Sequence, residues 1–337
     1  MDKPRYFMAF CTASFIVSML CVFCVSFFPQ EHKAVTKEGD FIKWVDFNVS
    51  YAALSDCLKY DTTTYGTAAH ASWIDLLACL AAKGSGTFDS YKSSDLKKIT
   101  TELEKGLALE SITGKLKSFP YYQEAFSAVL SGFVGEYEIE TPEGAMEKKY
   151  GLKAFSPIAR GYAYSDFDDF GAGRSYGFKR KHLGHDMMGS IGTPIVAVES
   201  GYVECVGWNQ YGGWRIGIRS FDKKRYYYYA HLRKDHPYND MYEGKVVTAG
   251  DVIGYLGMTG YSTKENVNNI NTPHLHWGMQ LIFDESQKDA VSEIWIDVYA
   301  ITKLLRQNQS AVYRPEGTKE FERKYQMFEP GYEVFSH

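Results

Sequence analysis

The stretch G-T-P-I-V-A-V-E-S-G-Y-V at residues 192–203 decides the fold of the C-terminal half of this chain. Ile195 to Val198 is a short apolar run, Ser200-Gly201 follows as a turn, and Tyr202 to Gly207 forms the next run. Short β-branched runs separated by glycine turns are typical of β-strands with brief connections. This stretch therefore predicts two successive strands.

The same pattern continues toward the C-terminus. Four more segments are apolar and bounded by turn residues, and they occupy residues 215–219, 225–231, 252–256 and 275–282. At least six strands with connections of hairpin length predict a mostly antiparallel sheet. This sheet is expected within a domain at 156–310.

An apolar stripe follows the predicted strands. It predicts a C-terminal helix from Ser292 to Gln307, and its members are Ile294, Val298, Ile301 and Leu305. Residues 311–337 are polar and are expected to form a surface tail.

The region before the sheet has helical periodicity. Ser72 and Asp75 have capping-box spacing before a leucine run that ends at Gly84. Leucine and isoleucine recur at helical spacing in 94–109, and Pro120 opens a third run. We therefore expect a small all-α domain.

The predicted domain order makes the fold class α+β. A stalk at 29–46 leads to the all-α domain at 47–134, and a linker at 135–155 leads to the sheet domain.

The N-terminal 28 residues predict a membrane anchor. Residues 8–28 carry no charged side chain and are long enough to cross a bilayer. Lys3 and Arg5 precede them, which places the short N-terminal tip in the cytoplasm and the rest of the chain outside. A cleaved signal peptide, which would give a secreted form, is the weaker alternative because no A-x-A site follows.

Composition restricts the partners and the stabilising chemistry. The net charge of −4 gives no signal for a polyanionic partner, so no nucleic acid is expected. Only Cys57, Cys79 and Cys205 lie outside the apolar N-terminal segment, and an odd number does not predict a disulfide framework.

Five residues in three short strings carry the chemistry. The strings are H-L-G-H-D at 182–186, Y-A-H-L at 229–232 and H-L-H-W at 274–277, and they contain His182, Asp186, His231, His274 and His276. Two neutral imidazoles and one carboxylate make a common hydrolytic zinc site. The two remaining histidines are then available for proton transfer, so the strings predict zinc-dependent hydrolysis.

Strand alternation assigns side chains to faces. His274 and His276 are two residues apart and share a face. Counting back along the tyrosine run places Tyr227 and Tyr229 on the face of His231. They are candidate substrate contacts. The alternative is that both side chains only pack within the sheet.

The strings and the turns between them resemble the lysostaphin/LytM-type zinc peptidases over residues 156–285. Further matching strings are Y-Y-A-H-L, A-G-D-V-I-G-Y-L-G-M-T-G and T-P-H-L-H-W-G-M. The resemblance implies one Zn²⁺ per chain, held by His182, Asp186 and His276. It implies that His231 and His274 act beside the metal, and that the substrates are peptide bonds of bacterial peptidoglycan.

The expected mechanism uses a zinc-activated water as the nucleophile on the scissile carbonyl. His231 or His274 takes the proton and the other stabilises the oxyanion, and the sequence does not assign which does which.

Two alternatives remain. The same fold could serve as a non-catalytic scaffold that binds a partner or the cell wall, as in sporulation channels. The string G-R-S-Y-G at 173–177 also matches the G-x-S-x-G pattern of serine hydrolases, with Ser175 as nucleophile.

Overall fold

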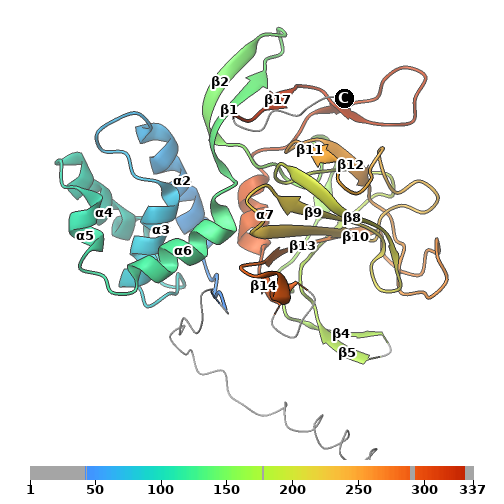
Figure 1. Cartoon of the computed structure of the whole chain (residues 1–337), viewed down its shortest axis with the longest axis horizontal. Helices are drawn as coiled ribbons and strands as arrows, with labels where there is room; N and C mark the ends of the chain where they lie inside the picture. The colour runs from blue at the N-terminus through green and yellow to red at the C-terminus, as the bar shows by residue number, and fades with distance from the viewer. Residues whose placement is uncertain (1–41, 43, 177, 289–292, 331–337) are drawn as a thin grey trace, which may run out of the picture. The chain divides into compact units, whose positions relative to one another are not determined.

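The computed structural model describes residues 42, 44–176, 178–288 and 293–330 (Figure 1). The apolar segment at 8–28 lies outside the described residues, so the membrane anchor stays a prediction. Within the described part, none of the helices combines the length and the apolar character that a bilayer crossing requires.

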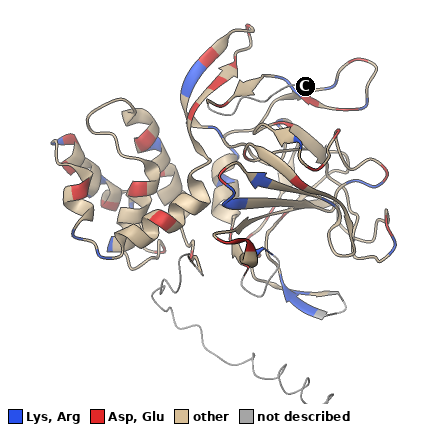
Figure 2. Ribbon diagram, viewed as in Figure 1, with Lys and Arg blue, Asp and Glu red and all other residues tan. Residues whose placement is uncertain are grey.

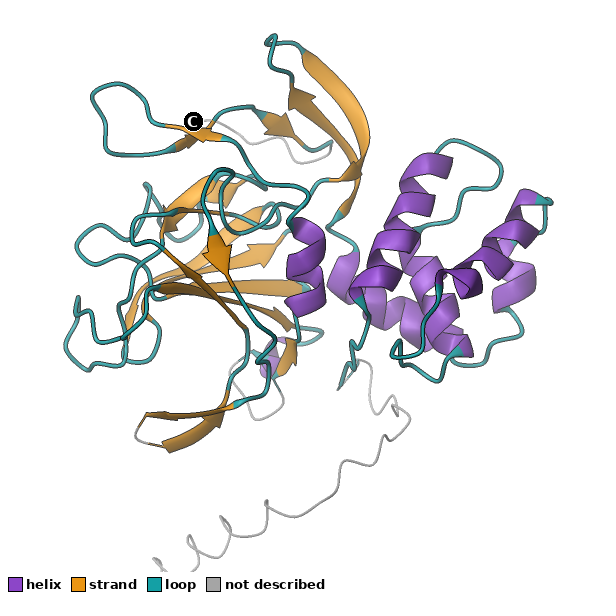
Figure 3. Cartoon of the chain, turned by 180° about the vertical axis from the view of Figure 1, so that it is seen from behind, coloured by secondary structure: helices purple, strands orange, loops and turns teal. Residues whose placement is uncertain are grey.

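Five helices form the first part of the described chain, and Figure 3 shows them as a group separate from the strands. They are α2 (Tyr51–Thr64), α3 (Trp73–Lys83), α4 (Ser93–Glu104), α5 (Leu109–Thr113) and α6 (Phe119–Leu130). The predicted start of α3 is confirmed, because the Ser72 hydroxyl accepts a hydrogen bond from the backbone N–H of Asp75 at 3.1 Å. Pro120 lies in the first turn of α6, where its missing N–H costs no helical hydrogen bond.

The helix predicted over 94–109 is shorter than expected. α4 ends at Glu104, and Gly106 adopts a left-handed conformation with φ +89°. The backbone N–H of Leu107 then bonds to the carbonyl of Glu102 at 3.0 Å, a pattern that closes a helix. The helix therefore ends near Gly106, although apolar residues at helical spacing continue beyond it.

The predicted antiparallel sheet is confirmed. Its strands follow the order β11-β8-β9-β10-β13-β6-β3, with β14 also paired to β13, and every pair is antiparallel. The bounds are β3 (Tyr164–Ser165), β6 (His185–Gly189), β8 (Gly201–Asn209), β9 (Gly213–Ser220), β10 (Arg225–Ala230), β11 (Val246–Val247), β13 (His274–Leu281) and β14 (Ile294–Ile296).

The two strands expected in 192–207 both exist, but they belong to different sheets. β7 (Pro194–Val196) pairs with β12 (Val252–Tyr255) in a two-stranded sheet, whereas β8 pairs with β9 and β11. The predicted turn at Ser200-Gly201 is not formed, because Gly201 is already the first residue of β8. The chain passes from one sheet to the other between Val196 and Gly201, which local patterning does not reveal.

The predicted C-terminal helix over 292–307 is wrong in its first half. Residues 294–296 form strand β14, and helix α7 occupies only Tyr299–Leu305. Ile294 and Ile296 are both buried, as expected for side chains two residues apart on one face of a strand. This strand pairs with β13. Ile294 fits both the helical period of 3.6 residues and the strand period of two. Pairing with β13 decides that this segment is a strand.

The segments predicted as linker and tail meet in a third sheet. β1 (Val134–Glu140) and β2 (Met146–Leu152) form a hairpin, and β17 (Met327–Phe328) pairs with β1. Two further hairpins are β15 (Val312–Tyr313) with β16 (Glu322–Arg323), and β4 (Gly173–Tyr176) with β5 (Phe178–Lys181). The single-turn helix η1 spans Glu285–Gln287.

A buried polar network joins α6 to the sheet. The Arg225 guanidinium is 2% exposed and donates to the Glu199 carboxylate at 2.8 and 3.0 Å. It also donates to the carbonyl of Ala128 in α6 at 2.8 Å. Because each of these groups is paired, the network can remain buried between α6 and the sheet.

Candidate metal centre

Two adjacent strands bring the three predicted metal ligands together. His276 on β13 pairs in register with Asp186 on β6, and His182 lies just before β6. Gly184 permits this approach, because a Cβ there would lie 2.6 Å from the His276 ring. The H-L-G-H-D string therefore needs glycine at its centre for a steric reason.

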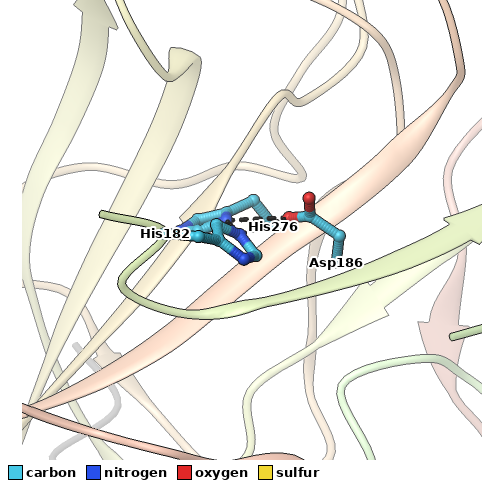
Figure 4. A group of neighbouring side chains, drawn as sticks. All are labelled: His182, Asp186 and His276. Carbon is cyan, nitrogen blue, oxygen red and sulfur yellow. Dashed lines mark hydrogen bonds and ion pairs between the residues drawn. The ribbon is translucent and has the colours of Figure 1, made fainter. Parts of the chain in front are cut away.

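The donor atoms of the three side chains converge (Figure 4). Asp186 Oδ1 lies 3.0 Å from His182 Nε2 and 2.9 Å from His276 Nδ1, and the two ring nitrogens are 3.0 Å apart. A tetrahedral ion with bonds of about 2.0–2.1 Å holds its ligands roughly 3.3 Å apart, so small shifts suffice to admit zinc. The residues fit a divalent metal ion with two imidazole ligands and one carboxylate.

Local electrostatics favour the metal-binding forms of Asp186 and His276. Burial has the largest effect on the Asp186 carboxyl and raises its pKa, but the adjacent imidazoles of His182 and His276 outweigh it, and the pKa falls well below the usual range. Burial lowers the pKa of His276 against the opposing effect of Asp186. An ionised carboxylate and a neutral imidazole are the species that bind metals.

Asp169 and Arg174 contact two of the three ligands, His182 and Asp186, and neither residue was predicted from the sequence. His182 Nδ1 donates to the Asp169 carbonyl at 3.3 Å and lies 3.1 Å from its carboxylate. Arg174 Nη2 lies 3.3 Å from Asp186 Oδ2 and also pairs with Asp169. Such contacts orient metal ligands. The acidic run at 166–169 is a compositional signal, but its spacing to His182 follows no fixed pattern.

His231 and His274 lie beside the three ligands. Their ring centroids are 4.7 Å apart, and His274 Nε2 lies 3.7 Å from Asp186 Oδ1. His231 Nδ1 donates to the Thr259 carbonyl at 2.9 Å, and His274 Nδ1 donates to the Thr272 carbonyl at 2.8 Å. Because a carbonyl can only accept, each neutral ring carries its proton on Nδ1 and leaves Nε2 able to take one.

His231 is buried beside other imidazoles. Burial lowers its pKa well below the usual value, and His274 and His276 lower it further. The neutral form, which accepts protons, is therefore favoured.

Tyr227 and Tyr229 do not face the site, contrary to the strand count. Both are fully buried, where the Tyr227 hydroxyl donates to Glu199 and the Tyr229 hydroxyl accepts from the backbone N–H of Val198 at 3.0 Å. β10 ends before His231, whose φ of +62° breaks the alternation on which the count relied. Both residues pack in the core and cannot contact substrate.

Tyr228 is the tyrosine of this run that faces the metal ligands. Its ring centroid lies 6.0 Å from that of His276, and its hydroxyl accepts a hydrogen bond from the Asn209 amide at 3.3 Å.

The serine-hydrolase alternative is wrong. Ser175 lies in β4, and its neighbour in sequence is strand β5, which pairs with β4 in antiparallel fashion. A nucleophile elbow needs a sharp turn from a strand into a helix. The described residues around Ser175 do not form one.

The fold and the site together define a class of protein: a candidate metallohydrolase with a His-Asp-His centre on an antiparallel sheet. Residues 180–290 match the model of Peptidase family M23. The resemblance inferred from the five residues is thereby confirmed.

Two curated proteins are similar to part of the chain. The chain is 38% identical over 123 residues to the L-Ala–D-Glu endopeptidase of Bacillus subtilis, covering 36% of each chain. It is 41% identical over 97 residues to lysostaphin of Staphylococcus simulans, covering 28% of this chain and 17% of that protein. The chain therefore spans about a third or less of the length of these relatives.

One solved structure resembles most of the chain. It is the crystal structure of a protein from Ruminococcus gnavus described as a candidate glycyl-glycine endopeptidase lytM. The match covers 82% of this chain and 94% of that one, with a TM-score of 0.54 and 23% identity. At this identity the likeness concerns the fold alone.

Proposed function

We propose that this chain is a zinc-dependent endopeptidase that cleaves peptide bonds of bacterial peptidoglycan. The observation that carries the proposal is the convergence of His182, Asp186 and His276 within hydrogen-bonding distance of one another. Zinc held there would supply a Lewis acid and an acidified water.

The chain's own residues supply the proton transfers. His231 and His274 each hold a proton on Nδ1 through a backbone carbonyl, so each accepts or donates through Nε2. One of them, unprotonated at Nε2, takes a proton from the attacking water and later gives it to the leaving amine. The other stabilises the developing oxyanion when its Nε2 also carries a proton, because only a protonated nitrogen can donate. Arg174 and Asp169 keep the ligands oriented during these steps.

The substrate class rests on the relatives. The B. subtilis protein is an L-Ala–D-Glu endopeptidase, and a further relative in Vibrio cholerae, 30% identical over 155 residues, is a peptidoglycan DD-endopeptidase. Different bonds are cut by related chains, so the proposal extends to peptidoglycan peptides as a class.

We place the enzyme on the outer side of a bacterial membrane, anchored through residues 8–28. The proposal is supported by the uncharged length of that segment and the basic residues before it. Alkaline extraction of membranes should leave the full-length chain in the pellet. Recovery of a shorter, soluble chain would favour a cleaved signal peptide instead.

The activity is tested with the purified full-length chain and peptidoglycan of several wall types. Mass spectrometry of the digest should find newly cleaved peptide bonds, and a zinc chelator should abolish them until zinc is added back. If zinc-loaded protein binds peptidoglycan but cleaves no wall type, the scaffold alternative is favoured and the enzymatic proposal fails.

A further inference from the structure

The β4–β5 hairpin places two arginines opposite each other beside the candidate metal centre. Arg174 on β4 and Arg180 on β5 are direct cross-strand partners, and Figure 2 shows the basic character of this hairpin. Like charges at directly opposed positions destabilise a strand pair. Arg174 is compensated by Asp169 and Asp186.

Arg180 has no such compensation. Among the described residues, no carboxylate forms an ion pair with it. Its guanidinium carbon lies 5.7 Å from the ring centroid of Tyr211 and 5.2 Å from that of Tyr261, and Nη2 donates to the Tyr261 hydroxyl. Two aromatic rings hold the cation in place without neutralising its charge.

The guanidinium also has an unused donor. Arg180 Nε is buried and has no hydrogen-bond partner within the described structure. A buried N–H without an acceptor destabilises the folded chain, and it marks a place where an acceptor from outside the chain can bind. A guanidinium is well matched to a carboxylate because it offers planar, paired donors.

Tyr261 lies between Arg180 and the reacting histidines and links the two. The Tyr261 ring centroid lies 5.9 Å from that of His231. Tyr261 has a φ of +48°, and its backbone N–H donates to the Tyr211 carbonyl at 3.3 Å, so the two loops are tied together. A tyrosine in this conformation is held there by its surroundings.

We propose that Arg180, framed by Tyr211 and Tyr261, is a specificity residue that binds a carboxylate of the peptide substrate close to the scissile bond. The inference rests on the proposed endopeptidase function and names the chemistry that this site prefers. A substrate carboxylate there supplies the missing acceptor and offsets the charge of the second arginine.

The test compares two peptides that differ in one group. The probes are acetyl-Ala-D-Glu-Lys-D-Ala with a free D-Glu α-carboxylate and its twin with a carboxamide at that position. Each is assayed with the zinc-loaded full-length chain and with Arg180→Gln and Arg180→Lys. Lys179→Gln is the matched control, because Lys179 is the exposed neighbour on the same strand.

The wild-type chain should have a kcat/KM about 10- to 100-fold higher for the carboxylate peptide, mainly through KM. Arg180→Gln should remove this preference by weakening only the carboxylate peptide, and Arg180→Lys should restore part of it. Lys179→Gln should leave the preference unchanged. Equal loss on both peptides in Arg180→Gln, or no preference in the wild-type chain, would overturn the proposal.

Binding separates this inference from the proposed activity. The full-length His231→Ala variant is titrated with both peptides by calorimetry, with and without the added Arg180→Gln substitution. Selective carboxylate binding that depends on Arg180 supports the subsite even if no peptide is cleaved, in which case only the proposed activity fails. Equal affinity for the two peptides rejects the subsite whatever the activity.

Discussion

His231 and His274 face each other with ring centroids 4.7 Å apart, and the same loop anchors both. Thr259 accepts the Nδ1 proton of His231 at the start of this loop, and Thr272 accepts that of His274 at its end. The segment 259–272 therefore sets the tautomer of both histidines. Its shape matters for proton transfer as well as for substrate fit.

The first prediction separates metal binding from proton transfer. His276→Ala should lose most bound zinc, because it removes one of three converging ligands. His231→Ala should keep zinc and lose turnover by about 100-fold or more. Metal content by mass spectrometry and kcat are measured on each variant. His236→Ala, at an exposed ion pair with Glu320, is the control and should change neither. Equal zinc loss in His231→Ala and His276→Ala would show that the roles are misassigned.

A second prediction concerns the loop that anchors the histidines. A Cβ on Gly260 would lie 2.6 Å from the Tyr211 carbonyl and 3.0 Å from His231 Nδ1, at a φ of +123°. Gly260→Ala should therefore displace His231 and lower kcat while zinc content is kept. Gly244→Ala is the matched control, because Gly244 has a φ of +90° but open space around it. If both variants lose kcat equally, backbone strain and not the contact with His231 explains the loss.

A third prediction tests whether Asp169 orients His182 for zinc binding. Asp169→Asn should weaken zinc affinity about 10- to 100-fold, because it disturbs the partner of His182 Nδ1. Competition with a chromophoric chelator measures the affinity directly. The neighbouring exposed Asp168→Asn should bind zinc as the wild-type chain does. An unchanged affinity in Asp169→Asn would mean that His182 is oriented by the backbone carbonyl alone.

The buried Arg225 network predicts a large effect on stability. Arg225→Met leaves the Glu199 carboxylate buried without its cation, which should lower the free energy of unfolding by about 3–5 kcal/mol. Urea unfolding followed by tryptophan fluorescence measures the change. Lys98→Met breaks an exposed pair with Asp95 that solvent screens, so its effect on the free energy of unfolding should be much smaller. Similar losses in the two variants would show that the buried network adds no special stability.

Much of this architecture follows from local sequence. Ser72 and Gly84 bound a helix because capping and termination depend on a few neighbouring residues. Alternation placed His274 and His276 correctly on one strand of an antiparallel sheet. The same rule failed for Tyr227 and Tyr229, because a left-handed residue at 231 ends the period.

By itself the sequence determined the hairpin-linked strands and the helical region before them, and it singled out the five residues that we propose carry the chemistry. Only the tertiary structure decided that residues 294–296 pair as a strand, that Asp169 and Arg174 support the ligands, and that Arg180 lies between two tyrosines. The physical reason is distance along the chain: His182 and His276 meet across 94 positions. Local patterns specify periods and caps, whereas strand pairing and loop packing depend on which distant segments become neighbours.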